Sequence, residues 1–167
     1  FAAQAIAQAI RDTKARVVAH VDGYAASAAT EIAIAADEIE IAEGGFFMIH
    51  NAWTLAVGNA DDFTATVVLL NKVDDVLCSA YAVKCGKSKD EVKAWMDAET
   101  WFSAQEAVDA GLVDRIAEGA KASASAWNLA AYDQAPAPAD ADDAALQAHR
   151  DRQAQRLSVI CRASPIV

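Results

Sequence analysis

Apolar residues in the first half of the chain occur in two kinds of stretch, which predict short strands between helices. Short apolar or alternating runs bounded by glycine or charged residues are typical of strands, and three are predicted: residues 17–21, 38–42 and 46–50. Alanine is the strongest helix former, and the two alanine-rich stretches predict helices over residues 1–13 and 27–36. Ser27, an N-cap type of residue, is therefore expected at a strand-to-helix junction.

The second half of the chain predicts one long helix, two short helices and a final strand. Between positions 61 and 85, apolar residues recur at three- and four-residue steps, which predicts a long helix with a broad apolar face. S-x-x-E capping boxes that begin at Ser88 and Ser103 each predict a short helix, and Gly111 is expected to end the second one. Residues 112–117 predict the last strand. Because strands alternate with helices, the predicted fold class is α/β with mostly parallel strands.

The composition changes beyond Gly119 to alanine, serine, proline and aspartate. Such a stretch is too polar and too often interrupted by proline to build a core. We therefore expect one folded domain over residues 1–118 and a flexible linker or tail over 119–167, with a helix over 143–160 that needs a partner to be stable.

Charge and apolar content narrow the classes of partner. Fourteen Lys and Arg residues against 24 Asp and Glu residues give a net charge of −10, which repels a phosphate backbone, so no nucleic-acid partner is expected. No apolar run approaches the roughly 18 residues that span a bilayer and no signal segment opens the chain, so we expect a cytoplasmic protein without a membrane partner. Neither the three cysteines nor the three histidines have metal-ligand spacing, and no cofactor or metal is expected.

Ser27 is the first residue with possible chemistry. A serine at a helix start presents its hydroxyl at a tight turn, and the free N–H groups of the helix end can stabilise an oxyanion. However, Gly23-Tyr-Ala-Ala-Ser27 lacks the G-x-S-x-G form of a nucleophile elbow. Taken alone, the pattern favours a serine that caps the helix.

His50 is the candidate base because imidazole titrates near neutral pH and can take the proton of a hydroxyl. A lone histidine at a strand end is more often structural, so His50 is a candidate base only if it pairs with Ser27. The other two histidines serve less well, since His20 is expected in the core and His149 lies in the polar tail.

Three blocks of sequence occur together in one known family. They are Gly23-Tyr-Ala-Ala-Ser27, which is similar to G-x-A-A-S; Met48-Ile-His50, which is similar to M-I-H; and Trp101-Phe-Ser-Ala-Gln-Glu-Ala-Val-Asp-Ala-Gly-Leu-Val-Asp114, which is similar to F-x-S-A-x-E-A-x-x-x-G-L-V-D. With them, residues 15–118 resemble the proteolytic subunit of Clp protease, and in particular the Clp-related proteases that phages use in head (prohead) maturation.

The resemblance implies a serine endopeptidase with Ser27 as nucleophile, His50 as base and the Ala28 N–H as an oxyanion donor. The family places an aspartate at the position of Glu99, and a glutamate can also orient an imidazole. Asp97, two residues earlier, is a rival for the third member of the triad.

The resemblance also implies the Clp- and crotonase-like fold, a superhelix of repeated β-β-α units, and a homo-oligomeric ring with the helix at 61–85 between rings. In the family a second oxyanion donor comes from a glycine pair ahead of the helix that begins here at Phe1, so the domain is expected to be incomplete at its N-terminus and its activity uncertain. The implied substrates are polypeptides, including phage capsid or scaffold proteins, which would place the enzyme in the host cytoplasm or in the prohead.

Two other readings stay open. A Ser-Lys peptidase of the signal-peptide-peptidase type would use a lysine such as Lys72 or Lys84 as base, although the Met48-Ile-His50 block argues against it. A non-catalytic crotonase-like assembly module would keep Ser27 only as a helix cap.

Overall fold

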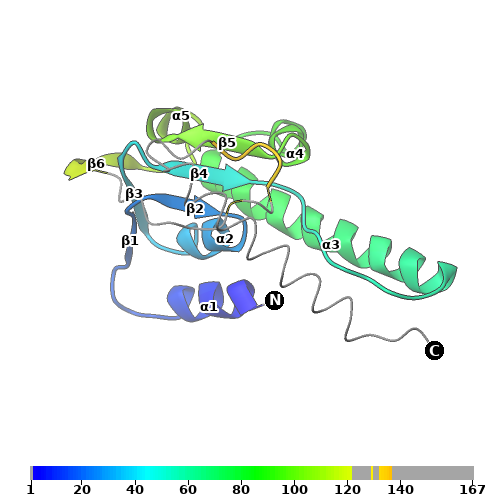
Figure 1. The fold of residues 1–167 in the computed structure, drawn as a ribbon. Coiled ribbons are helices and arrows are strands. Elements are labelled where there is room, and N and C mark those ends of the chain that lie inside the picture. The colour runs from blue at the N-terminus through cyan, green and yellow to red at the C-terminus, as the bar shows by residue number, and fades with distance from the viewer. Residues whose placement is uncertain (1, 122–128, 130–131, 137–167) are drawn as a thin grey trace, which may run out of the picture. The chain divides into compact units, whose positions relative to one another are not determined.

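A computed structural model describes residues 2–121, 129 and 132–136 of the chain (Figure 1). The chain divides into two compact units, Phe1–Ala135 and Pro136–Val167, and every helix and strand described here belongs to the first. The helix expected over 143–160 lies outside the described residues, and the predicted domain boundary after residue 118 stays a prediction. None of the described helices is both long enough and apolar enough to cross a membrane.

Strands and helices are interspersed along the first unit, as the α/β prediction requires, with pairs of successive strands between some of the helices. The helices are α1 (Ala2–Arg11), α2 (Ala28–Ala33), α3 (Ala60–Cys85), α4 (Lys89–Asp97) and α5 (Ala104–Asp109). The strands are β1 (Val18–Val21), β2 (Tyr24–Ala26), β3 (Glu38–Glu43), β4 (Phe46–Ile49), β5 (Thr100–Ser103) and β6 (Arg115–Lys121).

Two strands, β2 and β5, were not predicted, and β6 begins later than predicted. β2 has three residues and β5 has four, which is too short for an alternating pattern to be recognised. Leu112 and Val113 do not open the last strand, because their N–H groups donate to the Ala107 carbonyl at 3.0 and 3.2 Å and so close the end of α5.

The strands form two sheets of three. One has the order β1-β3-β6 and is parallel throughout, whereas the other has the order β2-β4-β5, with β2 parallel and β5 antiparallel to β4. In the second sheet Ala26 pairs with Met48 and Ile49 pairs with Thr100. The last residues of β2 and β4 and the first residue of β5 therefore meet at one edge of the sheet.

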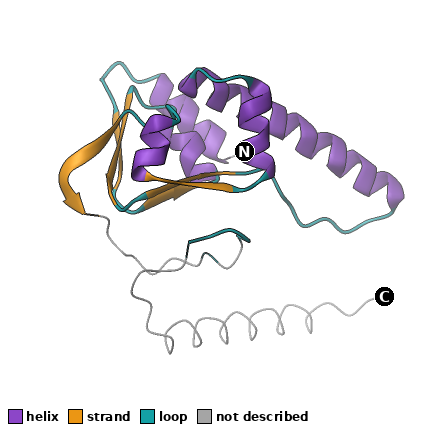
Figure 2. Ribbon diagram, turned by 90° about the horizontal axis from the view of Figure 1, so that it is seen from above, coloured by secondary structure: helices purple, strands orange, loops and turns teal. Residues whose placement is uncertain are grey.

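The core lies between the sheets and the helices. Five of its large side chains are 0 or 1% exposed: Phe47, Ile39, Ile49, Tyr81 and Leu112. In Figure 2 the strands of the two sheets border one cluster of helices. Burying apolar surface of this kind is the main favourable term in folding.

Helix α3 has two different halves. Its predicted extent of 61–85 is confirmed within one residue, and Asn59 and Gly86 cap its two ends. The C-terminal half buries Asp74, Cys78 and Tyr81, whereas the N-terminal half extends beyond the strands in both views (Figures 1 and 2). Apolar side chains on that half remain exposed: Phe63, Val67, Val68 and Leu69.

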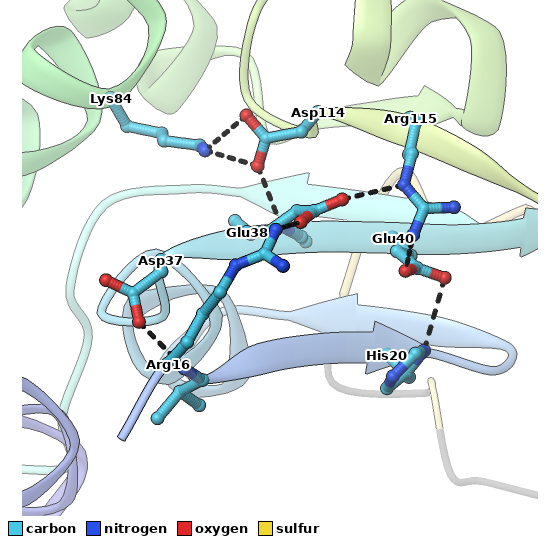
Figure 3. Close-up of polar contacts among 10 residues, drawn as sticks. Arg16, His20, Asp37, Glu38, Glu40, Lys84, Asp114 and Arg115 are labelled. Atoms are coloured by element: carbon cyan, nitrogen blue, oxygen red, sulfur yellow. Dashed lines mark hydrogen bonds and ion pairs between the residues drawn. The ribbon is translucent and has the colours of Figure 1, made fainter. Parts of the chain in front are cut away.

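Ion pairs tie the strands of the parallel sheet together (Figure 3). Arg115 of β6 pairs with Glu38, at 2.7 Å, and with Glu40, which is 8% exposed. His20 lies 3.4 Å from Glu40 across the strand pair. The prediction that His20 is a core residue is wrong, because β1 is an edge strand and its His20 side chain is exposed.

Candidate active site

Ser27 connects β2 to α2 in a backbone conformation that few residues adopt. Its φ of 57° and ψ of −120° lie in a region that favours glycine. Its N–H donates to the Met48 carbonyl at 3.1 Å, which extends the pairing of β2 with β4, and its carbonyl accepts the Thr30 hydroxyl at 2.5 Å. These hydrogen bonds hold the strained turn in place.

The Ser27 hydroxyl does not cap the helix. Ser27 occupies the N-cap position of α2, as predicted, but its side chain makes no capping hydrogen bond. Its Oγ instead lies 2.7 Å from Nε2 of His50, the residue that follows β4. The capping role that the local pattern favours is therefore wrong, and the tertiary structure pairs the two residues that the sequence singled out.

Burial sets the protonation of His50. The ring is half-buried, and burial lowers the pKa of His50 because it disfavours the charged imidazolium. The negative charges of Glu99 and then Asp74 raise this pKa, and they offset the burial only in part. The neutral imidazole therefore predominates near neutral pH and can accept the hydroxyl proton of Ser27.

The two acids predicted for the third position have different surroundings. Glu99 immediately precedes β5, has a φ of 49°, and is the acid whose charge acts most on His50. Asp97 is exposed, accepts the side-chain N–H of Asn51 at 2.8 Å and pairs with Lys93, contacts that lower the pKa of Asp97. Among the described residues, no hydrogen bond joins either carboxylate to the His50 ring.

The Glu99 carboxylate has other partners in this structure. Its Oε1 accepts the backbone N–H of Gln134 at 2.7 Å and the indole N–H of Trp101 at 3.4 Å. One oxygen of the carboxylate is therefore already used by groups other than His50.

Asp74 is a third acid near His50, and the sequence analysis missed it. It is 8% exposed on α3, and its Oδ1 accepts the N–H of Ala52, two residues after His50, at 2.6 Å. The available signal was its helical register, because Asp74 shares the i, i+4, i+7 stripe of Cys78 and Tyr81 and thus lies on the buried face.

The lysines of the Ser-Lys reading lie elsewhere. Lys84 pairs with Asp114 at 2.7 Å, next to the parallel sheet, and Lys72 is exposed on α3. Ala28, the predicted oxyanion donor, is the first residue of α2. An N–H at that position has no partner within its own helix, and Ala28 directly follows Ser27 in the chain.

A hydroxyl with a neutral imidazole in hydrogen-bond reach is the arrangement that activates a serine for acyl transfer. In the first unit this pair lies at one edge of the β2-β4-β5 sheet, where Ser27 directly follows β2 and His50 directly follows β4.

Comparison with known proteins gives two matches. The family model described as Clp protease matches residues 1–120. The ATP-dependent Clp protease proteolytic subunit 1 of Leifsonia xyli subsp. xyli (strain CTCB07) is 38% identical over 63 residues, which cover 38% of this chain and 32% of that relative. The matched segment therefore spans about a third of the relative's length. Since the family match covers well over half of the sequence, the chain belongs to the Clp protease family.

Proposed function

We propose that the chain is a serine endopeptidase in which Ser27 is the nucleophile and His50 is the general base. The observation that carries this proposal is the 2.7 Å contact between Ser27 Oγ and His50 Nε2, made by a serine that leaves its helix uncapped. Membership of the Clp protease family supports peptide bonds as the target.

The chemistry begins when a peptide carbonyl lies against Ser27. His50 Nε2 takes the hydroxyl proton while Oγ bonds to the carbonyl carbon, and the imidazolium then donates that proton to the leaving amine. The acyl group stays on Ser27 until a water, deprotonated by His50, releases it. The N–H of Ala28 stabilises the oxyanion, aided by the positive end of α2.

We assign to Glu99 the role of the acid that stabilises the His50 imidazolium. A carboxylate near His50 stabilises the cation that forms when the ring takes the proton. Two observations favour Glu99 over Asp97: its charge acts on His50, and Asp97 is already paired with Lys93 and bonded to Asn51. Glu99 also immediately precedes Thr100, which pairs with Ile49, the residue before His50.

The same proposal extends to the substrates and to the assembly of the protein. The family relationship favours polypeptide substrates and a ring of identical chains, and the exposed apolar side chains on the N-terminal half of α3 offer a surface for contact between copies. The resemblance to phage head maturation proteases favours capsid or scaffold proteins as the substrate class.

The test is labelling of the serine by a fluorophosphonate, followed by intact-mass measurement. We expect one adduct on the parent chain, none on Ser27→Ala, and a strong loss of labelling in His50→Ala. Ser88→Ala is the matched control, because Ser88 is a serine whose side chain does cap its helix, and it should label like the parent.

The outcomes separate the competing functions. Undiminished labelling of His50→Ala would indicate another base, as in a Ser-Lys peptidase. No adduct on any variant would contradict the peptidase and favour an assembly module.

A further inference from the structure

Tyr132 lies against the proposed catalytic base. Its ring contacts the His50 ring edge-on, with centroids 5.4 Å apart and planes at 75°. Its backbone N–H donates to the Leu129 carbonyl at 3.0 Å. Figure 1 shows residues 132–135, in orange, near the C-terminal end of β4.

The same tyrosine adds to a group of aromatic residues on the β2-β4-β5 sheet. Trp101 of β5 contacts Tyr24 of β2 and Phe46 of β4, each with ring centroids 6.4 Å apart. We call Tyr24, Phe46 and Trp101 the aromatic shelf. Tyr132 packs edge-on against Trp101 at 5.8 Å, so its ring lies between the shelf and His50.

The backbone of this segment reaches the proposed acid. The N–H of Gln134 donates to Glu99 Oε1 at 2.7 Å. Residues 132–134 thus contact the base with an aromatic side chain and the acid with a backbone N–H group. An extended substrate peptide offers these same two kinds of group.

We propose that the aromatic shelf is a peptide-binding subsite for an aromatic side chain, and that Tyr132 occupies it in cis, so that residues 132–134 compete with substrate and keep Glu99 from His50. This inference rests on the proposed function of Ser27 and His50. An occupant on the same chain has a high effective concentration, which favours its binding when no substrate is present. Because edge-on aromatic contacts are individually weak, a substrate with an aromatic residue can displace the segment.

The first test compares the rate at which a fluorophosphonate labels Ser27 in variants of Tyr132. We expect Tyr132→Ala to label about five- to a hundredfold faster than the parent, the size expected from losing its two aromatic contacts, with His50 and Trp101. Tyr132→Phe keeps the ring and should stay slow. Asp133→Ala is the control, because Asp133 is exposed in the same segment.

The second test removes the hydrogen bond to Glu99. Gln134→Pro deletes the backbone N–H that Glu99 accepts, whereas Gln134→Ala keeps it and serves as the matched control. We expect faster labelling only in Gln134→Pro.

The third test supplies the segment in trans. A synthetic peptide with the sequence of residues 129–136 should slow the labelling of Tyr132→Ala, and the same peptide with alanine in place of its tyrosine should not. NMR gives a readout without activity: the ring-proton signals of His50 should move in Tyr132→Ala, which removes the ring current, and not in Asp133→Ala.

The results distinguish the inference from the proposed function. No label on any variant would overturn the function and the subsite together. Labelling of Ser27 at equal rates in the parent and Tyr132→Ala would overturn the subsite alone, as would His50 signals that do not move.

Discussion

At the scale of single residues, Ser27 combines a strained backbone with a hydrogen bond to His50. A serine at φ 57° is held in a conformation that is strained for any residue with a side chain, at a cost of about 1–3 kcal/mol. The cost is compensated by the hydrogen bonds from Ser27 to Met48 and from Thr30 to Ser27. The result is a hydroxyl that points at His50 Nε2 rather than at the N–H groups of α2.

Substitution of Glu99 and of Asp97 tests which of the two acids stabilises the His50 imidazolium. We expect Glu99→Gln to slow peptide hydrolysis about 10²- to 10⁴-fold, because an amide cannot stabilise the imidazolium as a carboxylate does. Asp97→Asn, which removes a charge two residues away, should change the rate little. The measurement is kcat/KM on a peptide substrate, and the reverse ranking of the two variants would assign the role to Asp97.

The buried Asp74 predicts a change in pH dependence. Its negative charge raises the pKa of His50, so Asp74→Asn should lower that pKa further and leave the base neutral at more acidic pH. The acidic limb of the pH–rate profile should then move to lower pH, while the amide oxygen still accepts the N–H of Ala52.

The adjacent Asp75 provides the control for that experiment. Asp75 is exposed on the same helix, so Asp75→Asn should leave the profile unchanged. An acidic limb that stays in place or moves to higher pH in Asp74→Asn would contradict the electrostatic role of Asp74.

At the scale of elements, a buried chain of hydroxyl groups joins α3 to the serine turn. The Thr30 hydroxyl donates to the Ser27 carbonyl at 2.5 Å and lies 2.6 Å from the Tyr81 hydroxyl. Since Thr30 has one hydroxyl hydrogen, Tyr81 must donate to Thr30. Thr30 and Tyr81 are 0 and 1% exposed, so water does not compete for these bonds.

These two hydrogen bonds predict that Tyr81 of α3 stabilises the turn at Ser27. Tyr81→Phe should lower the free energy of unfolding by about 1 kcal/mol, the usual contribution of one buried hydrogen bond. Thr30→Val should cost more because it breaks both bonds, and Thr30→Ser should retain most of the stability. Urea unfolding measures all three, and a Tyr81→Phe variant as stable as the parent would contradict the role of the hydroxyl.

At the scale of the whole molecule, the exposed half of α3 bears on assembly. Val68 is 49% exposed among other exposed apolar side chains, an arrangement typical of surfaces that contact another protein. We expect the protein to sediment as a multiple of the chain mass, and Val68→Asp to shift it to smaller species. Asn71→Asp adds the same charge at an exposed polar position of the same helix and should not.

Net charge gives this prediction a dependence on salt. Each chain carries a formal charge of −10, and salt screens the repulsion between like-charged copies. Assembly should therefore strengthen as the salt concentration rises. A monomeric parent at every salt concentration would contradict the assembly proposal.

The sequence by itself determined the elements with strong local signals. The long helix and both capped short helices follow from apolar periodicity and from the capping serines, Ser88 and Ser103. Three motif blocks predicted the family, and the match to the Clp protease family model confirms that prediction. These features are local, because side-chain spacing and backbone capping act within a few residues of each other.

Only the tertiary structure decided the contacts between distant segments. Ser27 and His50 are 23 residues apart and meet because β2 and β4 pair in parallel. Asp74, the exposure of His20 and the contact of Tyr132 with His50 also depend on packing. Periodicity specifies which face of an element is buried, but it does not specify the segment that covers it.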